Sequence, residues 1–79
     1  MKASYHGFSL EVSRAEKCPH CNLRGWTARV FMDDAQISDD VAGPWISATE
    51  AQNRAVLIAR QEIVKSGKPE PTDAPKWNQ

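Results

Sequence analysis

The chain has 79 residues, and its ten basic and ten acidic side chains cancel to a formal net charge of zero. This length suits one small domain, and the balanced charge excludes a global field that would draw the protein to nucleic acid or to an anionic membrane. No apolar stretch has the length of a bilayer span or of a secretory signal. We therefore expect a cytosolic protein whose two cysteines are reduced unless a metal holds them.

Two segments alternate apolar and polar residues with the period of a half-buried strand. In residues 6–12, the side chains of Phe8, Leu10 and Val12 share one face. Residues 26–32 repeat the pattern, with Trp26, Ala28, Val30 and Met32 on one face and Thr27, Arg29 and Phe31 on the other. The loop between them is too long for a tight turn, so we predict an antiparallel hairpin with an extended tip.

The segment after the second strand is rich in turn-forming residues. Residues 33–44 contain four aspartates, Gly43 and Pro44, which predicts a solvated loop. The sequence Trp-Ile-Ser at 45–47 is the candidate for a third short strand.

A single amphipathic helix is predicted over residues 48–66. Ser47 followed by Glu50 matches a capping box at its start, and Gly67 is a suitable stop. The inward stripe comprises Ala48, Ala51, Ala55, Ile58, Ala59 and Ile63. Because four of these six are alanines, we expect the helix axis to lie close to the sheet, under Trp26 and Phe8.

These elements predict a small α+β domain over residues 1–66, in which an antiparallel sheet of two to three strands packs against one C-terminal helix in β-β-β-α order. Residues 67–79 contain three prolines and no periodicity. We predict that they form a disordered tail, with Trp77 as its only anchor.

Three apolar residues are candidates for binding a partner. Leu57 and Val64 are seven residues apart on the helix, nearly opposite the inward stripe, and Phe31 lies on the polar side of its strand. Because exposed apolar patches usually have a use, we expect a second chain or the Trp77 tail to cover the two helix residues.

The motif Cys18-Pro19-His20-Cys21 has three interpretations. Two cysteines in this turn are typical of half a zinc site. His6 and His20 are poorly placed to complete it, so acidic side chains or the cysteines of a second chain would have to contribute. The same tetrapeptide is the active site of strongly oxidising thiol oxidases, but a strand pattern follows here where those enzymes have a helix that stabilises the thiolate. The third interpretation is a hairpin tip with two reduced thiols, or with a disulfide formed on air oxidation.

Basic residues gather on the predicted hairpin, namely Arg14, Lys17, Arg24 and Arg29. Together with Tyr5 and Phe31 they could bind single-stranded nucleic acid by charge and stacking. The alternative is an ordinary solvated surface, which the zero net charge favours.

Two families share this plan. The segments "YHGFSLEV", "GWTARVF" and "SATEAQNRAVLIARQEIV" resemble the HicB-like antitoxin domain, and Thr49, Glu50 and Ala51 match the opening of its helix. The helix also resembles the last helix of double-stranded-RNA-binding domains at Ser47, Ala51 and Ala55, but Ala48, Thr49 and Gln52 replace the lysines that grip phosphate there. Both resemblances imply a sheet covered by a helix.

We expect a non-enzymatic, bacterial binding domain of the cytosol that needs no cofactor and associates with another protein or with itself. The alternatives are a nucleic-acid-binding module built on the basic hairpin, and a zinc or thiol-redox protein built on Cys18 and Cys21.

Overall fold

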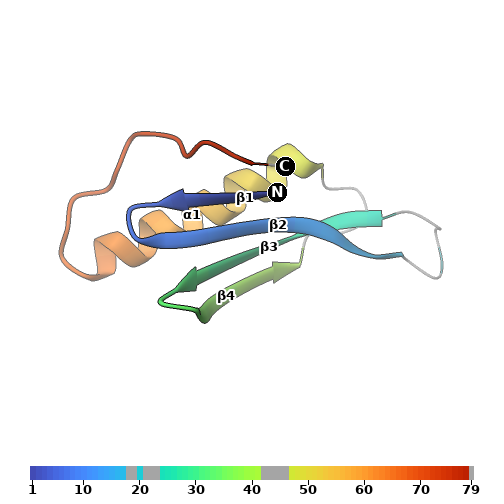
Figure 1. Ribbon diagram of the computed structural model, residues 1–79, viewed down its shortest axis with the longest axis horizontal. Helices are drawn as coiled ribbons and strands as arrows, with labels where there is room; N and C mark the ends of the chain where they lie inside the picture. The colour runs from blue at the N-terminus through green and yellow to red at the C-terminus, as the bar shows by residue number, and fades with distance from the viewer. Residues whose placement is uncertain (18–19, 21–23, 42–46, 79) are drawn as a thin grey trace.

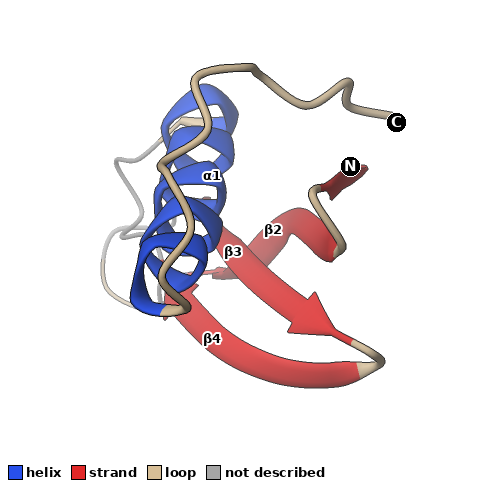
Figure 2. Ribbon diagram, turned by 90° about the vertical axis from the view of Figure 1, so that its left-hand side faces the viewer, coloured by secondary structure: helices blue, strands red, loops and turns tan. Residues whose placement is uncertain are grey.

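The computed structural model describes residues 1–17, 20, 24–41 and 47–78 (Figure 1). In order, the elements are β1 (Lys2–Tyr5), β2 (Phe8–Lys17), β3 (Arg24–Met32), β4 (Ala35–Val41) and α1 (Ala48–Lys65). The strands form one antiparallel sheet in the order β1-β2-β3-β4. The helix covers one face of this sheet, mainly over β2 and β3 (Figure 2). The predicted α+β class is confirmed.

The first hairpin has a strand that the alternation pattern did not reveal. His6 and Gly7 form its two-residue turn with positive φ angles of 47° and 87°, and Tyr5 pairs with Phe8 across it. Two left-handed residues are the mark of a type I′ turn, whose twist matches that of the strands. The strand predicted from residue 6 therefore begins at Phe8, and β1 precedes the turn.

The loop predicted over residues 33–44 is wrong for residues 35–41, which form β4. Asp33 and Asp34 make a second two-residue turn with φ angles of 52° and 65°. Aspartate tolerates this conformation better than most residues do. As an edge strand, β4 pairs on one side only, and edge strands commonly carry charge. Of the candidate strand at 45–47, residues 45 and 46 lie outside the described residues and Ser47 caps the helix.

The core lies between α1 and the inward residues of β1, β2 and β3. Phe8, Leu10, Val12, Ala28 and Val30 are buried, as the alternation predicted. Met32 departs from the pattern with 46% exposure, because it is the last residue of β3 before the turn to β4.

On the helix, the buried residues are Ala51, Ala55, Ala59 and Ile63. The three alanines have no exposed surface. Small side chains at three successive turns allow the helix to approach the sheet closely, as expected.

Both ends of the helix are capped at the predicted residues, Ser47 and Gly67. The Ser47 hydroxyl accepts a hydrogen bond of 3.2 Å from the Glu50 amide. At the other end the helix stops at Lys65, one residue earlier than predicted. Gly67 has a φ angle of +88°, and the amides of Gly67 and Lys68 donate to the carbonyls of Val64 and Ile63. These two bonds form a Schellman motif.

Replacing Ser47 with alanine should lower the free energy of unfolding by about 1 kcal/mol, because the Glu50 amide loses its acceptor. Urea denaturation measures this change, with the exposed Thr49→Ala as the matched control. A larger loss in Thr49→Ala than in Ser47→Ala would show that Ser47 is not the cap.

The segment 68–78, named the strap from here on, runs back past the helix and ends beside β1 (Figure 1). Its residue Asn78 pairs with Lys2: each amide donates to the other carbonyl, at 2.8 and 2.7 Å. Trp77 packs partly buried against the core. The sequence predicted a disordered tail with Trp77 as its only anchor. In the structure this segment is also attached to β1 through Asn78. Its prolines rule out a helix but are compatible with an extended chain.

Candidate functional site

The ridge is formed by Leu57 and Val64 on the outer face of α1. Their exposed fractions are 51% and 48%, and they project from the side of the helix opposite the alanine stripe. A shallow hollow of about 390 Å³ lies beside them, lined by Leu57, Arg60, Gln61, Val64, Lys65 and Glu70. The ridge is therefore an apolar feature with a polar, mixed-charge rim.

The strap leaves the ridge exposed. Its Trp77 packs against the buried cluster, and the neighbouring Asn78 pairs with β1. Glu70 reaches only the rim of the hollow. The sequence suggested that either a second chain or the Trp77 tail covers Leu57 and Val64. The tail is attached elsewhere, through Trp77 and Asn78.

Phe31 lies on the other side of the molecule. It pairs with Ser9, and both residues point away from the helix. Phe31 is half-buried in a separate hollow of about 410 Å³, whose lining residues are Lys2, Ala3, Ser4, Ser9, Leu10, Glu11, Phe31, Asp34 and Asn78. Since α1 covers the opposite face of the sheet, Phe31 and the ridge do not form a single surface.

The described arginines of the basic hairpin point to opposite faces of the sheet. Arg14 lies over the ring of its cross-strand neighbour Trp26, with its guanidinium carbon 5.1 Å from the ring centroid, on the helix side. Arg29 lies on the outer side, where its guanidinium is 3.9 Å from the Glu11 carboxylate. Lys17 and Arg24 are paired along the backbone, and their side chains lie outside the described structure. The two described arginines therefore do not form one basic face.

Cys18 and Cys21 lie outside the described residues, so their metal and redox chemistry remains a prediction. His20 between them is exposed. Within residues 1–17, 20, 24–41 and 47–78, no group of three or more His, Cys, Asp or Glu side chains is placed to hold a metal ion.

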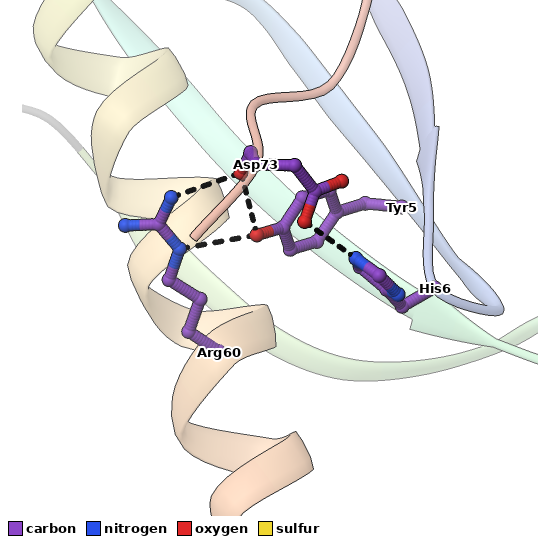
Figure 3. A network of polar contacts seen from close by, with 4 residues as sticks. All are labelled: Tyr5, His6, Arg60 and Asp73. Atoms are coloured by element: carbon purple, nitrogen blue, oxygen red, sulfur yellow. Dashed lines mark hydrogen bonds and ion pairs between the residues drawn. The ribbon is translucent and has the colours of Figure 1, made fainter. Parts of the chain in front are cut away.

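A polar cluster of Tyr5, His6, Arg60 and Asp73, named the latch, joins the strap to the sheet and the helix (Figure 3). The Asp73 carbonyl accepts from the Tyr5 hydroxyl at 2.9 Å and from Arg60 Nη2 at 3.0 Å. The Tyr5 oxygen in turn accepts from Arg60 Nε at 3.1 Å. His6 Nε2 is 2.8 Å from the Asp73 carboxylate, and the His6 ring meets the Tyr5 ring edge-on at 4.7 Å.

The latch favours the ionised forms of Asp73 and Arg60. The hydrogen bond from His6 lowers the pKa of Asp73 below its ordinary value, and the charge of Arg60 adds to this shift. The hydrogen bond to Tyr5 raises the pKa of Arg60, with a further contribution from the charges of Glu70 and Asp73. The latch therefore favours the negatively charged form of Asp73 on the strap.

Sequence reasoning missed the latch, and only part of it had a local signal. Ala3 and Tyr5 form a second, short apolar alternation that is out of phase with Phe8 and Leu10, and His6 with Gly7 fits a two-residue turn between the two strands. That reading would have placed Tyr5 in the core and His6 at a hairpin tip. Asp73 stands among prolines with no periodicity, so no pattern connects it to residues nearly the whole chain away.

No helix in the described part of the chain combines the length and the apolar character that crossing a membrane requires. Comparisons of the sequence with protein-family models and with curated proteins, and of the chain with solved structures, found no match. The resemblances to the HicB-like antitoxin domain and to double-stranded-RNA-binding domains stay predictions.

Proposed function

We propose that this chain is a non-enzymatic interaction domain of the cytosol that associates with a second copy of itself through the ridge. The observation that carries the proposal is the half exposure of Leu57 and Val64 on a helix face that the strap leaves open. Two large apolar side chains one heptad apart lie on the same side of the helix across two turns, and exposed apolar surface of this kind commonly marks an interaction site.

The spacing of the ridge suits a twofold partner. Residues seven apart lie about 10 Å from each other along a helix. If two copies of α1 pack antiparallel around a twofold axis near Gln61, Leu57 of each copy faces Val64 of the other, so the contact is self-complementary. The amide of Gln61 both donates and accepts hydrogen bonds, so it can pair with its symmetry mate at the axis.

The charges around the ridge support the same arrangement. Arg60 on the rim is bound within its own chain by Tyr5 and Asp73. Lys65 lies 3.5 Å from the Glu62 carboxylate, one turn away on the helix. Because Arg60 and Lys65 both have partners within their own chain, two copies of α1 can approach without placing unpaired positive charges next to each other.

The basic hairpin supports nucleic-acid binding less well. Arg14 is engaged with Trp26 and Arg29 with Glu11, on opposite faces of the sheet. Neither face collects the two described arginines into a groove that could follow a phosphate backbone.

Sedimentation equilibrium tests the proposal. We expect the average mass of the wild-type chain to rise with concentration, and the association to be weak because the apolar area per copy is small. Leu57→Lys with Val64→Lys should remain monomeric over the same range, since it places unpaired charges in the contact.

The matched control is Met32→Lys with Ile37→Lys, which changes two other exposed apolar residues, at 46% and 37% exposure, that belong to β3 and β4 and lie outside the ridge. It should associate like the wild type. A wild type that stays monomeric at the highest concentration, or a control that loses association equally, would reject the ridge as the contact.

A further inference from the structure

We propose that the strap is a releasable cover on the free edge of β1, and that the Asp73 carboxylate is the group whose protonation loosens it. The inference concerns the sheet edge and the latch, so it stands whether or not the ridge mediates self-association.

The edge of β1 is a place where a strand can add. β1 lies at one edge of the sheet, and β4 lies at the other. In a hairpin closed by a two-residue turn, the hydrogen-bonded pairs alternate along the strands, so Ala3 and Tyr5 bond to β2 while Lys2 and Ser4 direct their backbone groups outward. The bond from the Val12 amide to the Met1 carbonyl agrees with this alternation. An uncovered edge of this kind is a template for pairing with another chain.

The strap covers this edge through a small contact. Among the strap residues that the structure describes, Asn78 forms an isolated bridge to Lys2, so the end of the strap pairs with β1 at one residue. The strap contains Pro69, Pro71 and Pro75, which lack the N–H that a longer ladder would need at those positions. Attachment therefore depends on this one bridge, on the packing of Trp77 and on the latch.

Polar and charged side chains from three other parts of the chain surround Asp73. Facing it are His6 from the β1–β2 turn, Tyr5 from β1 and Arg60 from α1. Glu70, on the strap itself, adds a negative charge near Arg60. The Asp73 side chain is 61% exposed, so protons reach it freely. Protonation removes its negative charge from beside His6 and Arg60, whereas the two bonds to its backbone carbonyl remain.

The sign of the pH dependence follows from this geometry. Docking lowers the pKa of Asp73, chiefly through the hydrogen bond from His6. The contribution of the carboxylate to docking is therefore complete above the pKa of an undocked aspartate. It is lost as the pH falls through the lowered pKa of the docked strap.

Amide hydrogen exchange in the full-length chain tests the proposal. The amides of Asn78 and Lys2 report the bridge directly, and the amide of buried Val30 reports the stability of the whole fold. At neutral pH, Asp73→Asn should reduce protection at Asn78 by about two- to fivefold, the range typical of exposed charge pairs, with Val30 unchanged. In the wild type, protection at Asn78, corrected for the intrinsic rate, should fall by a similar factor on acidification, and in Asp73→Asn this fall should be absent.

Asp33→Asn is the matched control, because it makes the same chemical change at an exposed aspartate of the β3–β4 turn. It should behave like the wild type at Asn78. Equal protection at Asn78 in Asp73→Asn and the wild type would overturn the proposal. So would an acid-induced fall at Asn78 that persists in Asp73→Asn, or a loss at Asn78 that Val30 matches, since that would be global unfolding.

Discussion

Replacing Leu10 with alanine is expected to lower the free energy of unfolding by about 3 kcal/mol, within the range for truncating a buried leucine. Leu10 is among the largest fully buried side chains, with 1% of its surface exposed. It lies on β2 at the centre of the sheet, paired with Ala3 on one side and Val30 on the other. The lost methyl groups leave a cavity between three strands and the helix, which a hydrogen-bonded sheet cannot close.

Urea denaturation followed by circular dichroism measures this loss. Ile37→Ala is the control, because Ile37 is 37% exposed on the edge strand and its truncation should change stability far less. Small domains have only a few kcal/mol of stability to lose, so Leu10→Ala should be largely unfolded at moderate urea concentrations where the control is folded. Equal midpoints for the two variants would show that Leu10 is not in the core.

Ala55→Leu is expected to lower the free energy of unfolding by about 2 kcal/mol, although leucine is more apolar and nearly as good a helix former. Ala55 has no exposed surface and lies in the middle of the alanine stripe. A larger side chain there must push α1 away from β2 and β3 or take up a strained rotamer.

The matched control is Thr49→Leu, which adds a leucine at an exposed position in the first turn of the same helix. Thermal unfolding should show a lower midpoint for Ala55→Leu and little change for Thr49→Leu. A midpoint for Ala55→Leu at or above that of the wild type would mean that space exists between helix and sheet, contrary to the close approach inferred from the stripe.

The elements that were predictable from the sequence are those with a local signal. The inward faces of β2 and β3 follow from alternation at Phe8, Leu10 and Val30, and α1 follows from its alanine stripe and from the cap at Ser47. These signals arise within a few residues because strand and helix periods are local.

The elements that the sequence did not reveal depend on turns or on distant contacts. β1 and β4 become visible only when His6–Gly7 and Asp33–Asp34 are recognised as left-handed pairs, and aspartate pairs equally suit a loop. The latch joins Tyr5 to Asp73 across 68 positions of the chain. No periodic pattern extends that far, so the strap could be placed only by the fold.

The candidate site was predictable to a similar degree. The helical period alone places Leu57 and Val64 opposite the buried stripe, and their exposure in the structure agrees. For the basic hairpin, the strand alternation itself separates the two arginines, because Arg14 is in phase with the apolar face of β2 and Arg29 is out of phase with the apolar face of β3. The register of β2 against β3 agrees that these two arginines occupy opposite faces.

The most direct test of ridge-mediated self-association is an isotope-filtered nuclear Overhauser experiment on a mixture of labelled and unlabelled wild-type chains at high concentration. Within one helix, Leu57 and Val64 are about 10 Å apart along the axis, so a contact between their methyl groups in this experiment reports two chains packed antiparallel. We predict a cross-peak between Leu57 of one copy and Val64 of the other. A self-associated sample in which the contacts between chains involve neither residue, or a sample that shows no contact between chains, would contradict the proposed function.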